Sequence, residues 1–352
     1  MAKSFGGNFF EDFRIGQTLR HATPRTLTGG DVALYNAIYG GRFAVTSSDE
    51  FARRLDYPRS PVDELLAFHM VFGKTVPDIS LNAVANLGYA DCRFLKPVFP
   101  RDTLSAVSEV IGLKENSNRQ TGVVYVRTTG LNQAGDEVLS YVRWVMVRKR
   151  DAAAEVTGQS APKLPDAVAA GDLVLPDGIS FDRYDAALAG STALWDDYAA
   201  GEKIDHVDGV TVEESDHMLA TRLYQNTAKV HFNQHTEGQG RFGRRLIYGG
   251  HVISLARALS FNGLANAMQV LAINAGRHVN PLFAGLTVYA WSEVVEKAEI
   301  EGRFDVGALR LRLVATKDRP CADFPDKNEK GEYPADVILD LDYWAAMPRR
   351  IG

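Results

Sequence analysis

The stretch YQNTAKVHFN, from Tyr224 to Asn233, places a single imidazole in a helix-like segment. His231 could accept a proton at neutral pH, because an unperturbed imidazole has a pKa of about 6.5. Asn226, five residues earlier, cannot, because an amide only donates and accepts hydrogen bonds. A lone histidine can also simply pack against a backbone carbonyl, and the segment alone leaves both interpretations open.

A second candidate site follows in RRLIYGGHVISLARAL, where Gly249 and Gly250 begin an apolar helix directly after Tyr248. The N-terminus of a helix offers free N–H groups and a favourable dipole to negative charge. Two glycines leave those groups without a side chain in front of them. The alternative interpretation of the glycine pair is a tight turn.

Several cations lie near these two segments. An arginine fork suits a carboxylate or a phosphate, although any single surface cation is more often only solvated. The cluster therefore predicts an anion-binding region better than any one member does. Its members are Arg241, Arg244 and Arg245 before the glycines, with Lys229 inside the histidine segment and Arg277 at the start of a later stretch.

Composition limits the classes of function. The 352 residues are 45% hydrophobic and 24% charged, which is enough for one large or two smaller globular domains. A net charge of −5 argues against nucleic acid or an acidic membrane as the main partner. Two cysteines, Cys92 and Cys321, form neither a disulfide framework nor a metal-ligand pattern. No stretch is apolar enough for a membrane span, so we expect a soluble cytoplasmic protein.

The chain repeats itself. Three segments of the first half match three segments of the second half in the same order, at offsets of 185, 184 and 200 residues. The last offset implies an insertion, which the polar stretch from Thr316 to Ala335 supplies. The matching segments are Phe9 to His21 with Leu194 to His206, Arg93 to Ile111 with Arg277 to Val295, and the strand-like runs around Trp144 and Trp344.

These matches predict three parts: an N-terminal repeat over 1–150, a linker over 151–190 and a C-terminal repeat over 191–352. The linker is rich in Ala, Asp, Gly and Pro and lacks sustained periodicity. Its length would let the two copies pack side by side.

Each copy has the same order of predicted elements. A short extended entry precedes a first helix, for which Thr211 followed by Glu214 is typical capping chemistry in the second copy. A longer apolar helix follows, and then strands dense in β-branched and aromatic residues. The order predicts an α+β fold in which antiparallel strands wrap around one central helix, twice over.

These features resemble the MaoC-type, (R)-specific enoyl-CoA hydratases, which have the hotdog fold. The resemblance rests on FFEDFRIGQ at the start, a helix that opens after a threonine, and RFLKPVFPRDTL, and it covers nearly the whole chain once per half. It implies a double hotdog.

The same resemblance implies site residues. The family carries an Asp and a His five residues apart in a G-D-x-N-P-x-H segment, and the register of the repeat brings this segment onto Asn226 and His231. The histidine is present and the aspartate is not. The first half has Gly41 and Thr46 at these places. A His-Gly pair of the family corresponds to Tyr248-Gly249 here, and to Asp63 and Glu64 in the first half, so only the second half is expected to be active.

Within this family the closer resemblance is to the mesaconyl-CoA hydratases, also called β-methylmalyl-CoA dehydratases. It is carried by GNFFEDFRIGQTLRHATPRTLTGGDVALYNAIYG, the degenerate LYQNTAKVHFN and the closing VILDLDYWAAMPRR. It implies a hydro-lyase that adds or removes water on a branched dicarboxylyl-CoA thioester, with neither a metal nor a redox cofactor. The implied catalytic residues are His231, Asn226 and Gly249, and the substrate-binding residues are Tyr248, Gly250, Arg241, Arg244 and Arg245. Hotdog relatives pair through their sheets, so a homodimer or higher homo-oligomer is expected.

Other interpretations stay open at this point. Asp216, Glu213 or Glu237 could replace the missing aspartate, or His231 could supply the proton through the water itself. The chain could also hydrate fatty acyl-CoA, hydrolyse a thioester on the same fold, or bind acyl-CoA without catalysis, since a fold does not fix a reaction.

Overall fold

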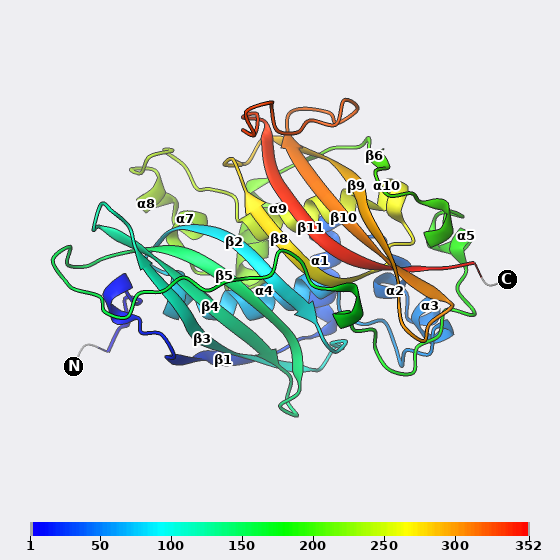
Figure 1. Cartoon of the computed structure of the whole chain (residues 1–352), viewed down its shortest axis with the longest axis horizontal. Helices are drawn as coiled ribbons and strands as arrows, with labels where there is room; N and C mark the ends of the chain where they lie inside the picture. Colours follow the sequence, from blue (N-terminus) through cyan, green and yellow to red (C-terminus); the bar gives the residue numbers. More distant parts are fainter. Residues whose placement is uncertain (1–2, 351–352) are drawn as a thin grey trace.

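The computed structural model describes residues 3–350 and contains one continuous antiparallel sheet (Figure 1). The sheet has the order β1-β3-β4-β5-β2-β8-β11-β10-β9-β6, and β7 also pairs with β9. The strands are β1 (Thr18–Thr26), β2 (Ala83–Phe94), β3 (Thr103–Glu115), β4 (Thr121–Leu131), β5 (Glu137–Arg148), β6 (Lys203–Asp205), β7 (Val210–Thr211), β8 (Gln269–His278), β9 (Thr287–Glu299), β10 (Val306–Lys317) and β11 (Val337–Pro348).

The helices gather on one face of this sheet. Two of them, α4 and α9, are the central helices of the two halves. The α-helices are α1 (Gly29–Tyr39), α2 (Ala44–Ser47), α3 (Asp49–Arg54), α4 (Glu64–Thr75), α5 (Ala186–Ala189), α6 (Glu214–Leu223), α7 (Lys229–Phe232), α8 (Gln234–Glu237), α9 (Gly249–Leu259) and α10 (Phe261–Leu264). The short turns are η1 (Phe10–Asp12), η2 (Val76–Ser80), η3 (Ala170–Asp172) and η4 (Trp195–Asp197).

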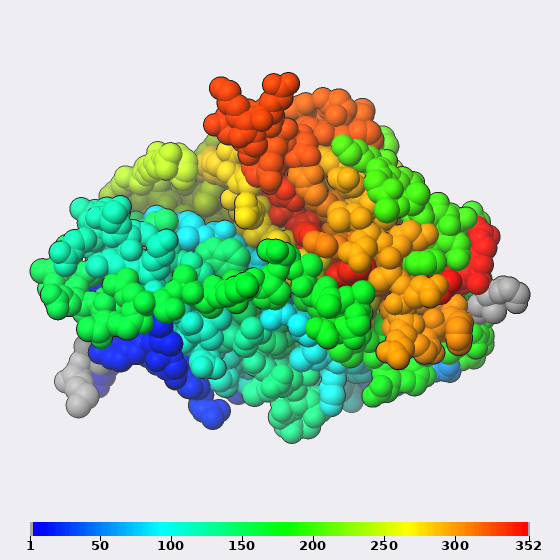
Figure 2. All heavy atoms as spheres, viewed as in Figure 1, coloured from blue at the N-terminus to red at the C-terminus, as the bar shows by residue number. Residues whose placement is uncertain are grey.

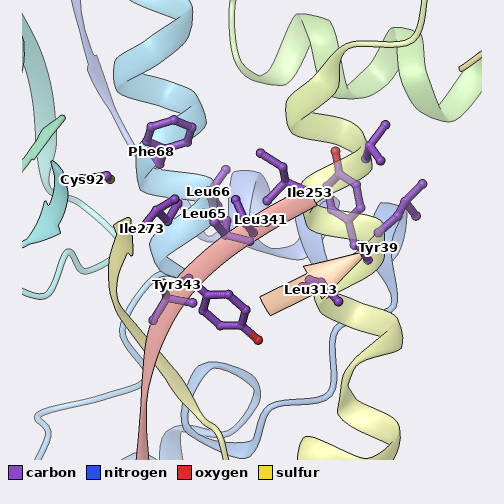
Figure 3. Packing of buried hydrophobic residues seen from close by; sticks show 14 of the residues in the cluster. Tyr39, Leu65, Leu66, Phe68, Cys92, Ile253, Ile273, Leu313, Leu341 and Tyr343 are labelled. Carbon is purple, nitrogen blue, oxygen red and sulfur yellow. The ribbon is translucent and has the colours of Figure 1, made fainter. Parts of the chain in front are cut away.

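The main core lies between the central helices and the sheet. Leu65, Leu66 and Phe68 of α4 and Ile253 of α9 are buried against Leu341 and other apolar residues of the strands (Figure 3). Burying a side chain of this size contributes roughly 1.5–3 kcal/mol. The two predicted apolar helices are therefore confirmed as buried helices, since most of the side chains of α4 and α9 are buried.

The predicted repeat is confirmed down to single hydrogen bonds. His21 Nε2 lies 2.8 Å from the Ser108 hydroxyl in the first half, and His206 Nε2 lies 2.8 Å from the Ser292 hydroxyl in the second. The halves join where β2 and β8 pair antiparallel, with Tyr89 opposite Gly276. The predicted double hotdog architecture is present, with each half of the continuous sheet wrapped around one central helix.

The predicted helix cap at Thr211 is wrong. Helix α6 begins at Glu214 after Glu213, and no side chain caps it. Thr211 instead lies in β7, where its hydroxyl is 2.9 Å from that of Thr287. Thr211 and Glu214 have the spacing of a capping box, but Thr211 pairs with Thr287 of β9 and does not reach the helix.

The segment 151–190 crosses the face of the sheet opposite the helices (Figure 2). Ser160 bridges to Leu113 of β3, and the N–H of Val168 donates to Asn274 Oδ1 at 2.9 Å. The indole of Trp344 donates to the Val168 carbonyl. The segment therefore contacts strands of both halves. The insertion predicted within 316–335 forms the loop between β10 and β11, which projects from one edge in Figure 1.

Among the helices of residues 3–350, none combines the length and the apolar character that crossing a bilayer requires.

Candidate active site

The histidine segment is not one helix, as its composition suggested, but a loop and a short helix. Helix α6 ends at Leu223, and Gln225 has a φ of 56°, which breaks the helical path. Asn226 is 1% exposed, and its Oδ1 accepts a hydrogen bond from the N–H of Ala228 at 3.2 Å. This bond turns the chain into α7, so that His231 is carried on a rigid single turn.

The tautomer of His231 follows from its partner. Its Nδ1 lies 2.8 Å from the carbonyl oxygen of Leu246. A carbonyl can only accept, so Nδ1 carries the proton and Nε2 of the neutral ring has a free lone pair. Burial lowers the pKa of His231 to about 4, and the carbonyl bond opposes this only in part. The ring is therefore neutral at pH 7 and able to accept a proton at Nε2.

Helix α9 begins beside this ring without a side-chain cap. The rings of His231 and Tyr248 have centroids 5.4 Å apart, and Tyr248 is the N-cap residue. The N–H of Tyr248 donates to His217 Nε2 at 2.9 Å. The N–H groups of Gly249 and Gly250 have no acceptor within residues 3–350. Two free donors and a helix dipole therefore lie next to the neutral imidazole.

Both glycines are required by close packing. A Cβ on Gly249 would overlap the imidazole of His278, and a Cβ on Gly250 would overlap the rings of Tyr248 and His69. The tight-turn interpretation does not apply, because both residues are in helix α9. A larger residue at 249 would displace His278 and cover the free N–H groups.

His278, at the end of β8, is a site residue that the sequence reasoning missed. Its Nε2 is buried and has no partner within residues 3–350, and burial lowers its pKa to about 4. At the offset of 184 residues, the first half has Phe94 at this place. This difference between the two copies, an imidazole where the other copy has a phenyl ring, could have pointed to His278 from the sequence.

The first half forms one wall of the site. The Phe72 ring of α4 is 5.6 Å from the ring of Tyr248, and His69 Nδ1 is 3.4 Å from the Tyr248 hydroxyl. A Cβ on Gly73 would overlap the carbonyl of Tyr224, so only glycine lets α4 approach the loop before His231. The site therefore lies where α4 of one copy meets α9 of the other.

The cations divide into two groups. Arg241 and Arg244 are exposed, with guanidinium groups over the rings of Phe242 and Phe283. Arg245 is partly buried and pairs with Glu214 at 2.8 Å. Lys229 and Arg277 are exposed.

The carboxylates considered as substitutes for the missing aspartate do not contact His231. Asp216 accepts a hydrogen bond from the Ser215 hydroxyl, Glu213 is exposed at the start of α6, and Glu237 lies in α8. Within residues 3–350, His231 has no carboxylate among its hydrogen-bond partners. Its ring neighbours are Tyr248 and His217.

Comparison with known proteins identifies the family of the chain. The model of the mesaconyl-CoA hydratase family matches residues 2–323. The chain is 65% identical over 347 residues to a mesaconyl-CoA hydratase of Cereibacter sphaeroides, covering 99% of this chain and 100% of that protein. It is 63% identical over 349 residues to a beta-methylmalyl-CoA dehydratase of Chloroflexus aurantiacus, covering 99% of each.

A solved structure supports the fold at greater distance. A Mycobacterium tuberculosis protein described as having a double hotdog fold is 24% identical, with a TM-score of 0.77 over 97% of this chain and 99% of that one. This likeness confirms the predicted fold class. With two relatives at more than 60% identity along their whole length and a family model over most of the sequence, the chain belongs to the mesaconyl-CoA hydratase family.

Proposed function

We propose that the chain is a hydro-lyase that interconverts mesaconyl-CoA and β-methylmalyl-CoA by adding and removing water. The substrate is the one named for the two relatives. The observation that carries the mechanism is the lone pair on His231 Nε2, which the bond from Nδ1 to the Leu246 carbonyl leaves free, on a ring that packs against Tyr248 at the uncapped start of α9.

In the hydration direction, His231 Nε2 takes a proton from water as the oxygen attacks the β-carbon. The C=C π electrons move toward the thioester, and the negative charge on its oxygen is stabilised by the N–H groups of Gly249 and Gly250. The imidazolium then delivers the proton to the α-carbon. One group thus serves as base and acid, which accounts for Asn226 in place of the aspartate: the amide holds the loop and transfers no proton.

The remaining assignments follow from exposure and charge. Tyr248 lines the site and orients the thioester at the helix start. Arg241 and Arg244, exposed and stacked on phenyl rings, suit the phosphates and the adenine of CoA, while Arg245 supports the site through Glu214. We propose a cytoplasmic protein that works as a homodimer or higher homo-oligomer, with an acyl-CoA thioester as its partner and no metal or redox cofactor.

The test is an assay of the purified protein with mesaconyl-CoA, followed by the absorbance of the conjugated thioester. Loss of absorbance without release of free thiol supports the proposal, and the reverse reaction from β-methylmalyl-CoA should restore it. Release of CoA would indicate a thioesterase. Turnover of straight-chain enoyl-CoA alone would indicate a fatty acyl hydratase, and no turnover of any thioester would indicate a binding protein.

A further inference from the structure

Arg143 is a buried cation without an acidic partner. It lies in β5 with 0% exposure and faces α4. Its Nη2 donates to the Thr75 hydroxyl at 2.7 Å, with a longer contact to Ser80, and its Nε has no acceptor. No carboxylate within residues 3–350 contacts it. A buried charge without a counter-ion costs several kcal/mol, so an arginine kept in this state calls for an explanation.

The position of Arg143 connects it to the candidate active site. Its Cζ lies 4.2 Å from the centroid of the Phe72 ring, and the centroids of the Phe72 and Tyr248 rings are 5.6 Å apart. The guanidinium and the residue that caps α9 therefore pack against the same ring.

The second half of the molecule contains a counterpart of Arg143, the arginine Arg257, which has carboxyl groups near it. Arg257 of α9 donates to the Ser260 hydroxyl at 3.0 Å, and Ser260 matches Thr75 at the offset of 185 residues. Arg257 itself matches Phe72, and its neighbour Tyr343 matches Arg143 at the offset of 200 residues. The guanidinium therefore occupies the same place in both halves, although it comes from the strand in one half and from the helix in the other.

The acids that face Arg257 are Asp63 and Glu64 at the start of α4. Burial raises the pKa of both carboxyl groups, and the charge of Arg257 opposes that rise. The matching residues at the start of α9 are Tyr248 and Gly249, which carry no charge. The start of α9 in the active half thus lacks the carboxyl groups found at the start of α4, and the arginine nearest to it, Arg143 of the first half, has no acidic partner within residues 3–350.

A second unpartnered polar group lies on β2, the strand that pairs with β5. Asn86 of β2 pairs with Val145, two residues along β5 from Arg143, and both atoms of its amide are buried without a hydrogen bond in residues 3–350. An amide donor next to a guanidinium fork suits a carboxylate with two oxygens.

We propose that Arg143 receives the free carboxylate of the acyl group, assisted by Asn86, while the thioester oxygen lies at the start of α9. The inference rests on the proposed function. It makes Arg143 the residue that selects a dicarboxylyl thioester over one with an uncharged end. Without substrate, the charge is offset by the C-terminal end of α4 and by the Phe72 ring.

The experiment compares two thioesters and three proteins. One substrate is mesaconyl-CoA, and the other is 2-methylbut-2-enoyl-CoA, in which a methyl group replaces the free carboxylate. The proteins are the wild type, Arg143→Gln, which can keep the bonds to Thr75 and Ser80, and Arg143→Lys, which keeps the charge without the fork. We expect kcat/KM for mesaconyl-CoA to fall about 10²–10³-fold in Arg143→Gln, with partial recovery of about tenfold in Arg143→Lys. Arg143→Gln should hydrate the methyl analogue at least as fast as the wild type does.

Equal losses for both thioesters would overturn the inference, because they would indicate a structural role. A wild type that does not hydrate mesaconyl-CoA would contradict the proposed function instead. If neither variant folds, binding to the wild type decides: methylsuccinyl-CoA should bind at least tenfold more tightly than 2-methylbutanoyl-CoA, and equal binding would refute the role of Arg143.

Discussion

The two central helices begin in opposite ways. At the start of α4, the carboxylate of Asp63 accepts from the N–H of Leu65 at 2.9 Å, and Glu64 is the first helical residue. At the start of α9, Tyr248 leaves the N–H groups of Gly249 and Gly250 free. The same helix end is therefore closed by an internal anion in one half and open to an external one in the other.

The segments that precede these two helices also differ between the halves in the polar group they leave free. His231 presents a free Nε2, whereas its counterpart Thr46 donates its hydroxyl to the Phe43 carbonyl at 3.2 Å. Val174 and Pro176 of the linker line a small pocket together with Glu64. The linker therefore packs near the start of α4, while the Phe72 ring of that helix packs against Tyr248 in the other site.

The largest expected effect comes from copying the first half onto the second. Gly249→Glu puts the residue found at position 64 at the start of α9, where it displaces His278 and brings a negative charge to the developing oxyanion. We expect kcat/KM for mesaconyl-CoA to fall by at least about 10³-fold. Gly41→Glu is the matched control, because a Cβ there meets nothing within 4 Å. If Gly249→Glu keeps more than a tenth of wild-type activity, the open helix end is not the oxyanion site.

The pH profile tests the base. Because burial lowers the pKa of His231 to about 4, the ring stays neutral well below the usual range. We expect kcat/KM to be flat from pH 8 to about 5 and then to fall tenfold per unit below about 4, in assays short enough to precede acid unfolding. An inflection near 6.5 would instead indicate a solvated imidazole as the base.

A milder change replaces the carboxyl group of Glu64 at the start of α4. Burial, followed by the charge of Asp63, raises the pKa of Glu64 to about 8, so the folded state binds a proton that the unfolded state loses above about 4.5. Stability from this group is present at low pH and is lost as pH rises toward 8. Glu64→Gln should therefore be more stable than the wild type by roughly 1 kcal/mol or more at pH 9. Turnover should stay within twofold, and a large loss would mean that Glu64 takes part in catalysis.

The smallest effect is expected at Thr46. Thr46→Ala removes one hydroxyl bonded to a backbone carbonyl, which should cost about 1 kcal/mol of unfolding free energy and leave kcat unchanged. Chemical denaturation and the absorbance assay measure the two quantities on the same preparation. A drop in kcat would contradict the view that the first half has lost its chemistry.

The fold could be predicted because its signals are local and repeated. The matching residues His21 and His206 each bond through Nε2 to a serine hydroxyl, so the repeat is visible in structure as well as in the three short sequence matches. The cap at Thr211 failed because a neighbouring strand, not the local spacing, decides the role of that threonine.

The site was only partly predictable. His231 and Gly249 lie within recognisable segments, and the structure brings them to one place. His278 and Arg143 lie on strands far along the chain, and their importance depends on which helix faces them. Comparing the copies position by position, with Phe94 against His278 and Tyr343 against Arg143, would have singled both out. The exposed Arg241 and Arg244 became candidates because they are close together in sequence, and closeness in sequence does not indicate whether a side chain is buried.

The central claim is that one imidazole of the second half performs the proton transfer. Its most direct test is the rate of absorbance loss from mesaconyl-CoA with His231→Ala, measured beside His235→Ala, an exposed histidine four residues away. The account predicts a loss of about 10³-fold for His231→Ala, with a cooperative unfolding transition that loses about 1 kcal/mol through the missing bond to Leu246, and no change for His235→Ala. Hydration by a folded His231→Ala protein within tenfold of the wild-type rate would contradict it.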